Sequence, residues 1–280
     1  MRFFTRKEVM GYRLRDTGYR IWSWFRHQLT SWNTGGEGIH SPYLFHLVRM
    51  IISDDNRYYC WDDIEERREA MLHAPKLVRV KDYGSRGKGR EEQRLVSDIA
   101  RTSLQSAKNA QVLFRIVTWL GHEKGEPLHM VELGTSLGIT TAYLAKADSR
   151  NTVETYEGSQ ALIELAERNW KKLGIENVQV VEGNIDDTLY IYNRKKPIDF
   201  GYIDANHTYE ATLRYFEALA QRKHEKTIIA LDDIHYNEEM ERAWKEIGER
   251  SDVTSTMDFY GFGLVFFDTH YLKRHYRLRI

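Results

Sequence analysis

Cysteine, surplus charge and long apolar runs are scarce in this sequence of 280 residues. Cys60 is the single cysteine, which excludes a disulfide within the chain and a metal site built from several cysteines. The 41 Lys and Arg residues balance 41 Asp and Glu residues, so the overall charge does not favour nucleic acid as a partner. No run approaches the roughly 20 apolar residues of a membrane span, and the first residues lack the apolar core of a secretion signal. We therefore expect a cytoplasmic protein without a membrane span.

The most informative segment present is a glycine turn between a strand and a helix. His129 to Leu133 is a short apolar run with a carboxylate near its end, and residues 139–147 have helical composition. Open α/β sheets build nucleotide or nucleoside sites from such a turn, because glycine lets the ligand approach the backbone. We expect the ligand to contact Glu132, Gly134, Thr135, Ser136 and Gly138.

Two features indicate which nucleoside this turn binds. The pyrophosphate fingerprint of dinucleotide sites has a glycine where this loop has Ser136, which weakens that interpretation. A second predicted strand, residues 152–156, ends at Glu157 and is followed by Gly158. A carboxylate at this strand tip suits a ribose diol, because both hydroxyls can donate to it. We therefore predict a ribose-bearing ligand that contacts Glu157 and Gly158.

The rest of the chain alternates strand and helix patterns. Helices are predicted to begin near residues 160, 208 and 237. The predicted strands comprise residues 178–181, 199–203 and 227–231, and a closing hairpin is formed by 253–257 and 263–267. Such alternation predicts a parallel sheet with helices on both faces.

Three aspartates directly follow two of these strands. Asp204 follows one, Asp232 and Asp233 follow the next, and parallel strands place all three at one edge of the sheet. Acids that lie so close raise one another's pKa unless a cation lies between them, and carboxylates suit Mg²⁺ or Ca²⁺. We predict these three as metal ligands. Without a metal, His207 and His235 are the candidate general bases, with Asp204 at the same site.

The ordered motifs resemble class I S-adenosylmethionine-dependent methyltransferases. The nearest resemblance is to the O-methyltransferases of the catechol and caffeoyl-CoA type and their bacterial relatives, and it covers roughly residues 105 to 270. It implies a Rossmann-like, doubly wound sheet of seven strands, mostly parallel with the last strand antiparallel. The motifs that carry it are Glu132-Leu133-Gly134-x-x-x-Gly138, Glu157, Gly183-Asn184-Ile185-Asp186 and Ile203-Asp204-Ala205-Asn206-His207.

The resemblance also implies roles for individual residues. Asn184 and Ile185 would flank the adenine of S-adenosylmethionine, with Asp186 or the backbone at its exocyclic amine. Asp204 would border the cofactor, and Ser103 or Ser106 would meet its methionine carboxylate. Asp204 and Asp232 match the family's metal-holding acids, whereas Asp233 stands where the family has asparagine. The metal, where used, would lower the pKa of the acceptor hydroxyl.

The first hundred residues lie outside the resemblance. We divide the chain into a helical lid or accessory segment, 1–104, and a catalytic domain, 105–280. The stripe of Trp22, Phe25, Leu29 and Trp32 predicts an amphipathic helix, and Ser41-Pro42 begins a second. These helices would pack on the catalytic domain or on a second subunit, which leaves a homodimer open, or would dock at a membrane interface.

Two cation-rich segments leave alternatives open. Residues 81–90, including Gly84 to Arg90, form either an anion-binding loop or a solvated one. The tail 270–280 is an edge extension or an oligomer contact, and we do not expect it to bind nucleic acid. The expected function is O-methylation of a small-molecule acceptor. Its rivals are a non-catalytic cofactor-binding or scaffold protein and an NAD-dependent oxidoreductase, which Ser136 disfavours.

Overall fold

The structure of this chain is a computed structural model. It describes residues 6–31, 38, 39, 41–52, 54, 56–84, 87, 89–190, 196–270 and 272–280, and for 6–17 and 52 it describes the backbone alone. The predictions made for Trp32, Ser85, Arg86 and Lys88 lie outside the described residues.

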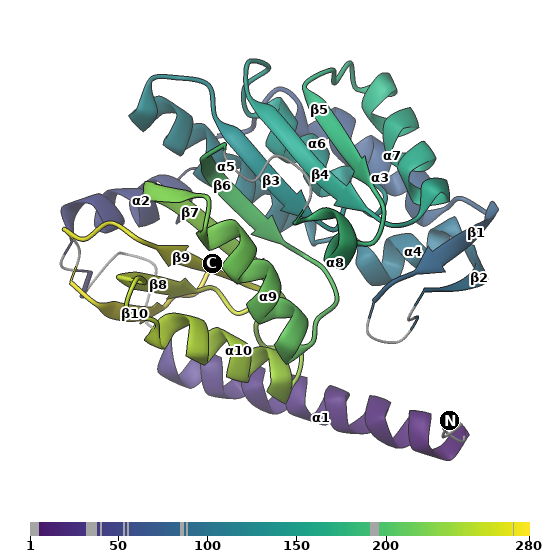
Figure 1. The fold of residues 1–280 in the computed structure, drawn as a ribbon, viewed down its shortest axis with the longest axis horizontal. Helices are drawn as coiled ribbons and strands as arrows, with labels where there is room; N and C mark the ends of the chain where they lie inside the picture. Colours follow the sequence, from purple (N-terminus) through teal and green to yellow (C-terminus); the bar gives the residue numbers. More distant parts are fainter. Residues whose placement is uncertain are drawn as a thin grey trace.

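The centre of the molecule is an eight-stranded sheet in the order β10-β8-β9-β7-β6-β3-β4-β5 (Figure 1). All neighbours run parallel except β9, which is antiparallel to β7 and β8. The strands are β3 His129–Leu133, β4 Thr152–Glu157, β5 Val178–Glu182, β6 Ile198–Ile203, β7 Lys223–Asp232, β8 Ser255–Asp258, β9 Phe262–Phe266 and β10 Arg274–Arg277. The doubly wound fold with a late antiparallel strand is confirmed, and β10 adds an eighth strand, so the C-terminal tail is an edge extension.

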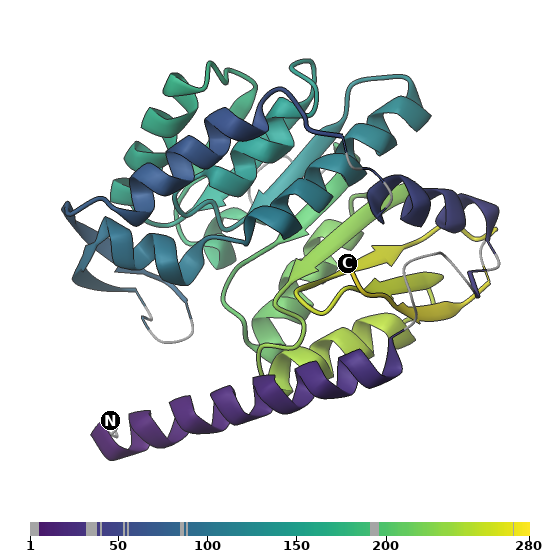
Figure 2. The ribbon, with the colours of Figure 1, turned by 180° about the vertical axis from the view of Figure 1, so that it is seen from behind.

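Helices cover both faces of the sheet. One face carries α9 and α10, and the other carries α2, α5 and α6, as the views from front and behind show (Figures 1 and 2). The bounds are α2 Pro42–Ile52, α5 Ala107–Lys124, α6 Ile139–Lys146, α7 Gln160–Lys172, α8 Ile185–Thr188, α9 Tyr209–Ala220 and α10 Glu238–Glu249. The left-handed Gly125 (φ 72°) caps the C-terminal end of α5.

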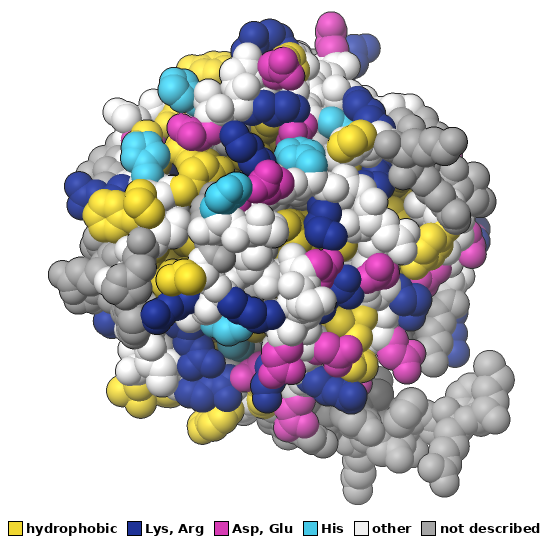
Figure 3. All heavy atoms as spheres, turned by 60° about the vertical axis from the view of Figure 1, so that its left-hand side comes forward, with side chains coloured by type: hydrophobic (Ala, Val, Ile, Leu, Met, Phe, Trp, Pro, Cys, Tyr) yellow, Lys and Arg dark blue, Asp and Glu magenta, His cyan; other side chains and the backbone are white. Residues whose placement is uncertain are grey.

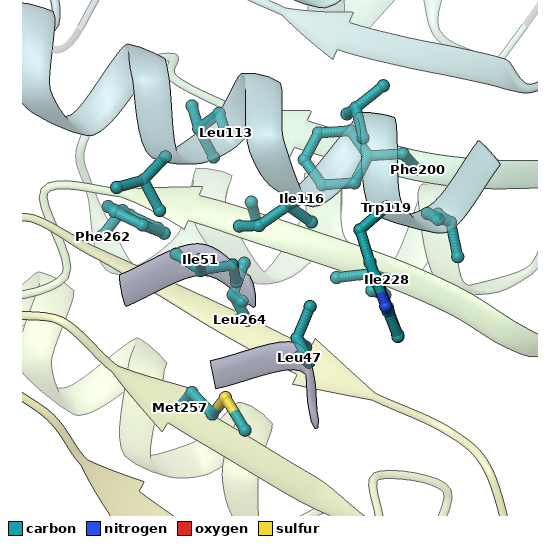
Figure 4. Close-up of a cluster of buried hydrophobic side chains, with 14 of the residues drawn as sticks. Leu47, Ile51, Leu113, Ile116, Trp119, Phe200, Ile228, Met257, Phe262 and Leu264 are labelled. Atoms are coloured by element: carbon teal, nitrogen blue, oxygen red, sulfur yellow. The ribbon is translucent and has the colours of Figure 1, made fainter. Parts of the chain in front are cut away.

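A cluster of buried apolar side chains joins α2 and α5 to the sheet (Figure 4). Leu47 and Ile51 of α2 are fully buried there, together with Ile116 of α5 and Ile228 and Leu264 of the strands. Each such side chain contributes about 1.5–3 kcal/mol on burial. The second predicted helix therefore packs on the central sheet, as in the first of the alternatives considered for it.

The remaining N-terminal elements lie outside the central sheet. They are α1 Arg6–Thr30, α3 Trp61–Leu72, the antiparallel hairpin of β1 Leu77–Asp82 and β2 Arg90–Leu95, and α4 Val96–Ser103. Of these, α3 packs on α4 and α6. The hairpin was not predicted, because the residues of β2 are all polar except the last and show no alternation between buried and exposed positions. Tyr83, Gly84, Gly87 and Gly89 are the described residues between the two strands.

The predicted stripe on α1 does not pack on the catalytic domain. Trp22, Phe25 and Leu29 are exposed, whereas Ser23 and His27 on the other side of the helix are buried. The apolar side chains of α1 therefore do not attach this helix to the hydrophobic core. Among the described helices, none combines the length and the apolar character needed to cross a bilayer.

Candidate functional site

The glycine turn lies where the chain reverses its winding direction in the sheet. β4 and β5 extend from one side of β3 and β6 and β7 from the other, so the ends of β3 and β6 are neighbours. The Asp204 N–H donates to the Leu133 carbonyl at 2.9 Å, and the Gly134 N–H donates to the Tyr156 carbonyl at 3.1 Å. Such a switch point is where open α/β sheets bind ligands. Gly134 has φ 103°, and a Cβ there would collide with the Asp204 carbonyl oxygen, so the position requires glycine.

The turn is held in a strained conformation. Ser136 is a non-glycine residue at φ 49°, which costs about 1–2 kcal/mol. Its N–H donates to Glu157 Oε2 at 2.9 Å, and its hydroxyl lies 2.8 Å from that of Ser103 at the end of α4. Gly138 lies against α7, where an added Cβ would come within 2.6 Å of Trp170 Nε1. Strain maintained by surrounding contacts is typical of ligand sites.

Glu157 lies at the tip of β4 beside this turn. The second oxygen of its carboxylate, Oε1, accepts from the Ser159 N–H at 2.9 Å. Burial raises the pKa of Glu157, although the backbone N–H groups of Ser159, Ser136 and Gly158 lower it in part. The backbone therefore orients both oxygens, and a carboxylate has further lone pairs for the hydroxyls of a ribose.

The β1–β2 hairpin covers the residue after Glu157. A Cβ on Gly158 would collide with the ring of Tyr83, which lies in the hairpin turn. Ser159 Oγ accepts from the Lys81 N–H at 3.4 Å, which joins β1 to the start of α7. Lys81 and Tyr83, at the start of the segment that the sequence left open as an anion-binding or solvated loop, thus lie beside the predicted ribose position.

Glu132 and Thr135 lie beneath the turn. Glu132 is fully buried, and its Oε2 accepts from the hydroxyls of Thr141 at 2.5 Å and Thr155 at 2.7 Å. Burial raises the pKa of Glu132 to about 8, although the bonds from Thr141 and Thr155 lower it in part. Thr135 Oγ1 lies 2.6 Å from Thr155 Oγ1. These contacts support the loop from below.

The segment expected near the adenine follows β5. The Gly183 N–H donates to the Glu157 carbonyl at 2.9 Å, which places Asn184 next to the tip of β4. Asn184 caps α8, accepting from the Asp186 N–H at 3.4 Å, and Ile185 begins that helix. Asp186 is paired with Arg214, whose Nη2 lies 2.9 Å from the carboxylate.

Ser106 is the N-cap of α5, and its hydroxyl accepts from the Asn109 N–H at 3.2 Å. Of the two serines considered for the methionine end of the cofactor, Ser103 is the one that contacts the glycine turn. The neighbouring Gln105 was missed in the sequence. Its amide nitrogen donates to Asp232. A single glutamine between two helices forms no sequence motif from which this contact could be predicted.

Asp204, Asp232 and His207 converge at the carboxyl edge, with one potential ligand atom of each within 4.8 Å of the others. Burial together with the carboxylates of Asp204 and Asp233 raises the pKa of Asp232 well above its usual range. His207 Nε2 lies 3.4 Å from Asp204 Oδ1 and has no hydrogen-bond partner among the described residues. Burial lowers the pKa of His207, but Asp204 and Asp233 outweigh it and raise the pKa overall.

This donor set fits a divalent cation. Two close carboxylates with a buried, unpartnered imidazole nitrogen provide negative charge and three ligand atoms. Asp233 is not part of this group. It has φ 51° and a side chain that is 40% exposed, and its carboxylate lies 3.8 Å from His207 Nε2. The structure thus brings together two of the three predicted aspartates and adds a histidine.

His235 lies apart from the Asp204 group. Its ring is buried beneath α1, with Nε2 2.9 Å from Asp258 Oδ2 and Nδ1 3.7 Å from Glu241 Oε2. Burial lowers the pKa of His235, but these two carboxylates raise it overall to about 9. A histidine held in this way serves to dock α1. Its position near Asp233 in the sequence did not reveal the direction of its side chain.

A cavity of about 560 Å³ lies at the opposite, amino edge of the sheet. Asp199 at its wall accepts from Lys124 Nζ and from the His129 N–H, each at 2.7 Å, and lies 3.1 Å from His224 Nε2. Burial raises the pKa of Asp199, but these partners lower it overall to about 2. Charged and histidine side chains mingle on this side of the molecule (Figure 3). Asp199, Lys124 and His224 form ion pairs or hydrogen bonds with one another at the edge opposite the glycine turn.

Comparisons with known proteins agree with this geometry. Residues 131–234 match the family model described as a methyltransferase domain, and no curated protein matches the chain. The O-methyltransferase TomG of Streptomyces achromogenes, solved with S-adenosylmethionine, is 19% identical, with 59% of this chain and 82% of that chain covered and a TM-score of 0.52. An O-methyltransferase of Bacillus cereus, solved with S-adenosylhomocysteine, is 17% identical (80% and 97% covered, TM-score 0.54). The Podospora anserina methyltransferase PaMTH1 is 13% identical (82% and 97%, TM-score 0.55). These likenesses confirm the fold.

Proposed function

We propose that this chain, which matches a methyltransferase-domain model over residues 131–234, transfers the methyl group of S-adenosylmethionine to an oxygen of a small-molecule acceptor. The family model matched over residues 131–234 supports the resemblance drawn from the sequence motifs, and the solved structures share the fold. The observation that carries the proposal is the glycine turn at the switch point, bonded to Glu157 on one side and packed on Asp204 on the other.

In this proposal the cofactor lies along the carboxyl edge of the sheet. Glu157 accepts hydrogen bonds from the ribose hydroxyls, and Asn184 and Ile185 lie at the adenine. The methionine end lies over the turn, near Ser136 and Ser103. The hydrogen bond of the Ser136 N–H to Glu157 supports this placement, because it joins the two parts of the predicted contact surface at 2.9 Å.

The acceptor would lie beside Asp204 and His207. The methyl group of a sulfonium cofactor is already activated, so most of the catalytic effect comes from aligning the acceptor oxygen with it. His207 is the proposed general base, because its Nε2 lacks a described hydrogen-bond partner and faces Asp204 at 3.4 Å. In the alternative mechanism, Asp204, Asp232 and His207 would hold a divalent cation such as Mg²⁺, and His207 would then be a ligand and not the base. The cation would supply positive charge that lowers the pKa of an acceptor hydroxyl.

Transfer of a labelled methyl group tests the proposal. The protein is incubated with isotope-labelled S-adenosylmethionine and a small-molecule extract, and products heavier by one labelled methyl group are sought by mass spectrometry. We expect the unchanged protein to form labelled products. The variants His207→Ala and Asp204→Asn should form less of them, and His207→Ala should retain its affinity for the cofactor. Cofactor binding without any transfer would instead support a cofactor-binding scaffold.

A chelator separates the two acceptor mechanisms. If a cation is held at Asp204 and Asp232, we expect a chelator to reduce transfer and added Mg²⁺ to restore it. Transfer that is unchanged by the chelator would leave His207 and alignment as the mechanism. We further propose a cytoplasmic location, no nucleic-acid partner and a homodimer, whose mass in solution light scattering measures.

A further inference from the structure

We propose that α1 docks on the surface of an anionic lipid bilayer through its outward-facing apolar side chains. The inference goes beyond methyl transfer and does not depend on it. It starts from an inverted arrangement of the helix, in which the side that faces the protein is polar and the side that faces outward is apolar.

The inner side of α1 is held by hydrogen bonds and ion pairs. His27 Nε2 lies 3.2 Å from Asp258 Oδ1, and the hydroxyl of Tyr260 donates to the Arg20 carbonyl at 2.8 Å. Tyr19 and Arg26 both bond to Glu241 of α10. A polar attachment of this kind fixes the orientation of the helix without using its apolar residues.

The outer side of α1 presents large apolar residues at three- and four-residue steps. The exposed fractions are 56% for Ile21, Trp22 and Phe25, 44% for Trp24 and 85% for Leu29. We call these five residues the outer stripe. Single exposed apolar residues are ordinary, but a continuous stripe of this size marks an interaction surface. The helix runs beside α10, and its first half extends past the rest of the fold in both views (Figures 1 and 2).

The charge of α1 selects the partner. The helix contains six Lys and Arg residues against two Asp and Glu residues, in a chain whose charges balance over its full length. Anionic lipid attracts such a segment, and Trp and Phe favour the interface between headgroups and acyl chains. A second copy of this chain would place one cationic helix against another, which disfavours it as the occupant.

Cations at the border of the outer stripe suit this geometry. The Arg26 guanidinium, which pairs with Glu241, lies 4.6 Å from the centre of the Trp22 ring at the border of the outer stripe. On the other border, Arg20 lies 5.5 Å from the ring centre of Tyr236, which itself lies 5.7 Å from the His207 ring. The helix that would contact lipid therefore also borders the site proposed for the acceptor.

Co-sedimentation of the full chain with vesicles tests the proposal. The vesicles contain either phosphatidylglycerol mixed with phosphatidylcholine or phosphatidylcholine alone. We expect binding to the anionic vesicles, weaker binding to the neutral ones, and loss of binding as salt rises. The variant Trp22→Ser/Phe25→Ser/Leu29→Ser should lose at least about tenfold in vesicle affinity, because it removes most of the outer stripe.

The matched control changes exposed apolar residues elsewhere. Leu77→Ser/Leu272→Ser alters side chains that are 58% and 69% exposed and should bind vesicles as the unchanged protein does. Circular dichroism verifies that both variants fold. The proposal would be overturned if the unchanged protein did not bind anionic vesicles. It would also be overturned if the control variant lost as much vesicle affinity as the α1 variant. Light scattering that shows a dimer dissociated by the α1 variant, without vesicle binding, would assign the stripe to a second copy instead.

Discussion

At the scale of single residues, Glu157 carries the predicted contact with the ribose. We expect Glu157→Gln to weaken S-adenosylmethionine binding about ten- to hundredfold, because hydrogen bonds to a charged group contribute about 1.5–3 kcal/mol. Equilibrium dialysis with labelled cofactor measures the change. Glu182→Gln is the control, because Glu182 ends the neighbouring strand β5 with an exposed side chain. Equal affinities for all three proteins would remove Glu157 from the site.

Residues adjacent in sequence to a strand end could be assigned from the sequence, and residues brought in from elsewhere could not. Gly134 and Asp204 follow apolar strands directly, so the parallel sheet places them together. His207 and His235 follow similar strands at similar distances, yet one joins Asp204 and the other joins Asp258. That difference depends on the direction of each side chain and on the position of α1. Neither can be predicted from the spacing or the types of the residues.

At the scale of elements, the glycine turn requires its first residue to be glycine for two separate reasons. Gly134→Ala adds left-handed strain and a collision with the Asp204 backbone, and we expect it to lower the free energy of unfolding by about 3 kcal/mol or more. Gly174→Ala is the matched control, because Gly174 is also left-handed (φ 61°) but has open space around it. It should cost about 1–2 kcal/mol. Urea unfolding compares the two, and equal costs would contradict the role of the collision.

The docking of α1 should depend on pH through His235. Its folded pKa of about 9 exceeds the usual value of 6.5, so protonated His235 stabilises the fold fully below pH 6.5. This contribution, about 3 kcal/mol at most, is lost as pH rises from 6.5 through 9. We expect the difference in melting temperature between the unchanged protein and His235→Gln to shrink over that window.

His270→Gln is the control for this measurement, because the side chain of His270 is 82% exposed. It should leave the melting temperature nearly unchanged across the same pH range. A difference between the unchanged protein and His235→Gln that stays constant from pH 6 to 9 would show that His235 does not titrate in the folded protein as proposed.

Most elements of the sheet could be predicted because apolar periodicity records burial. β3 and β6 are buried along their whole length, so their short apolar runs could be identified as strands from the sequence. The β1–β2 hairpin was missed because five of the six residues of β2 are polar. The side of α1 that faces the protein was also missed, because its contacts are ionic and an apolar stripe predicts the opposite orientation.

At the scale of the whole molecule, the two edges of the sheet differ in kind. The carboxyl edge combines strained backbone, raised carboxylate pKa values and an imidazole nitrogen without a partner among the described residues. The amino edge holds charged groups that satisfy one another around Asp199. Groups with shifted pKa values that gather at one edge indicate a functional site there. The helix α1, which is cationic and apolar on its outer side, lies next to the same edge.

Calorimetric titration of the purified chain with S-adenosylhomocysteine tests the central claim most directly. We predict saturable binding to one site per chain, with NAD giving no binding under the same conditions. Absence of binding by S-adenosylhomocysteine, or saturable binding of NAD in its place, would contradict the assignment of the carboxyl edge as a site for S-adenosylmethionine.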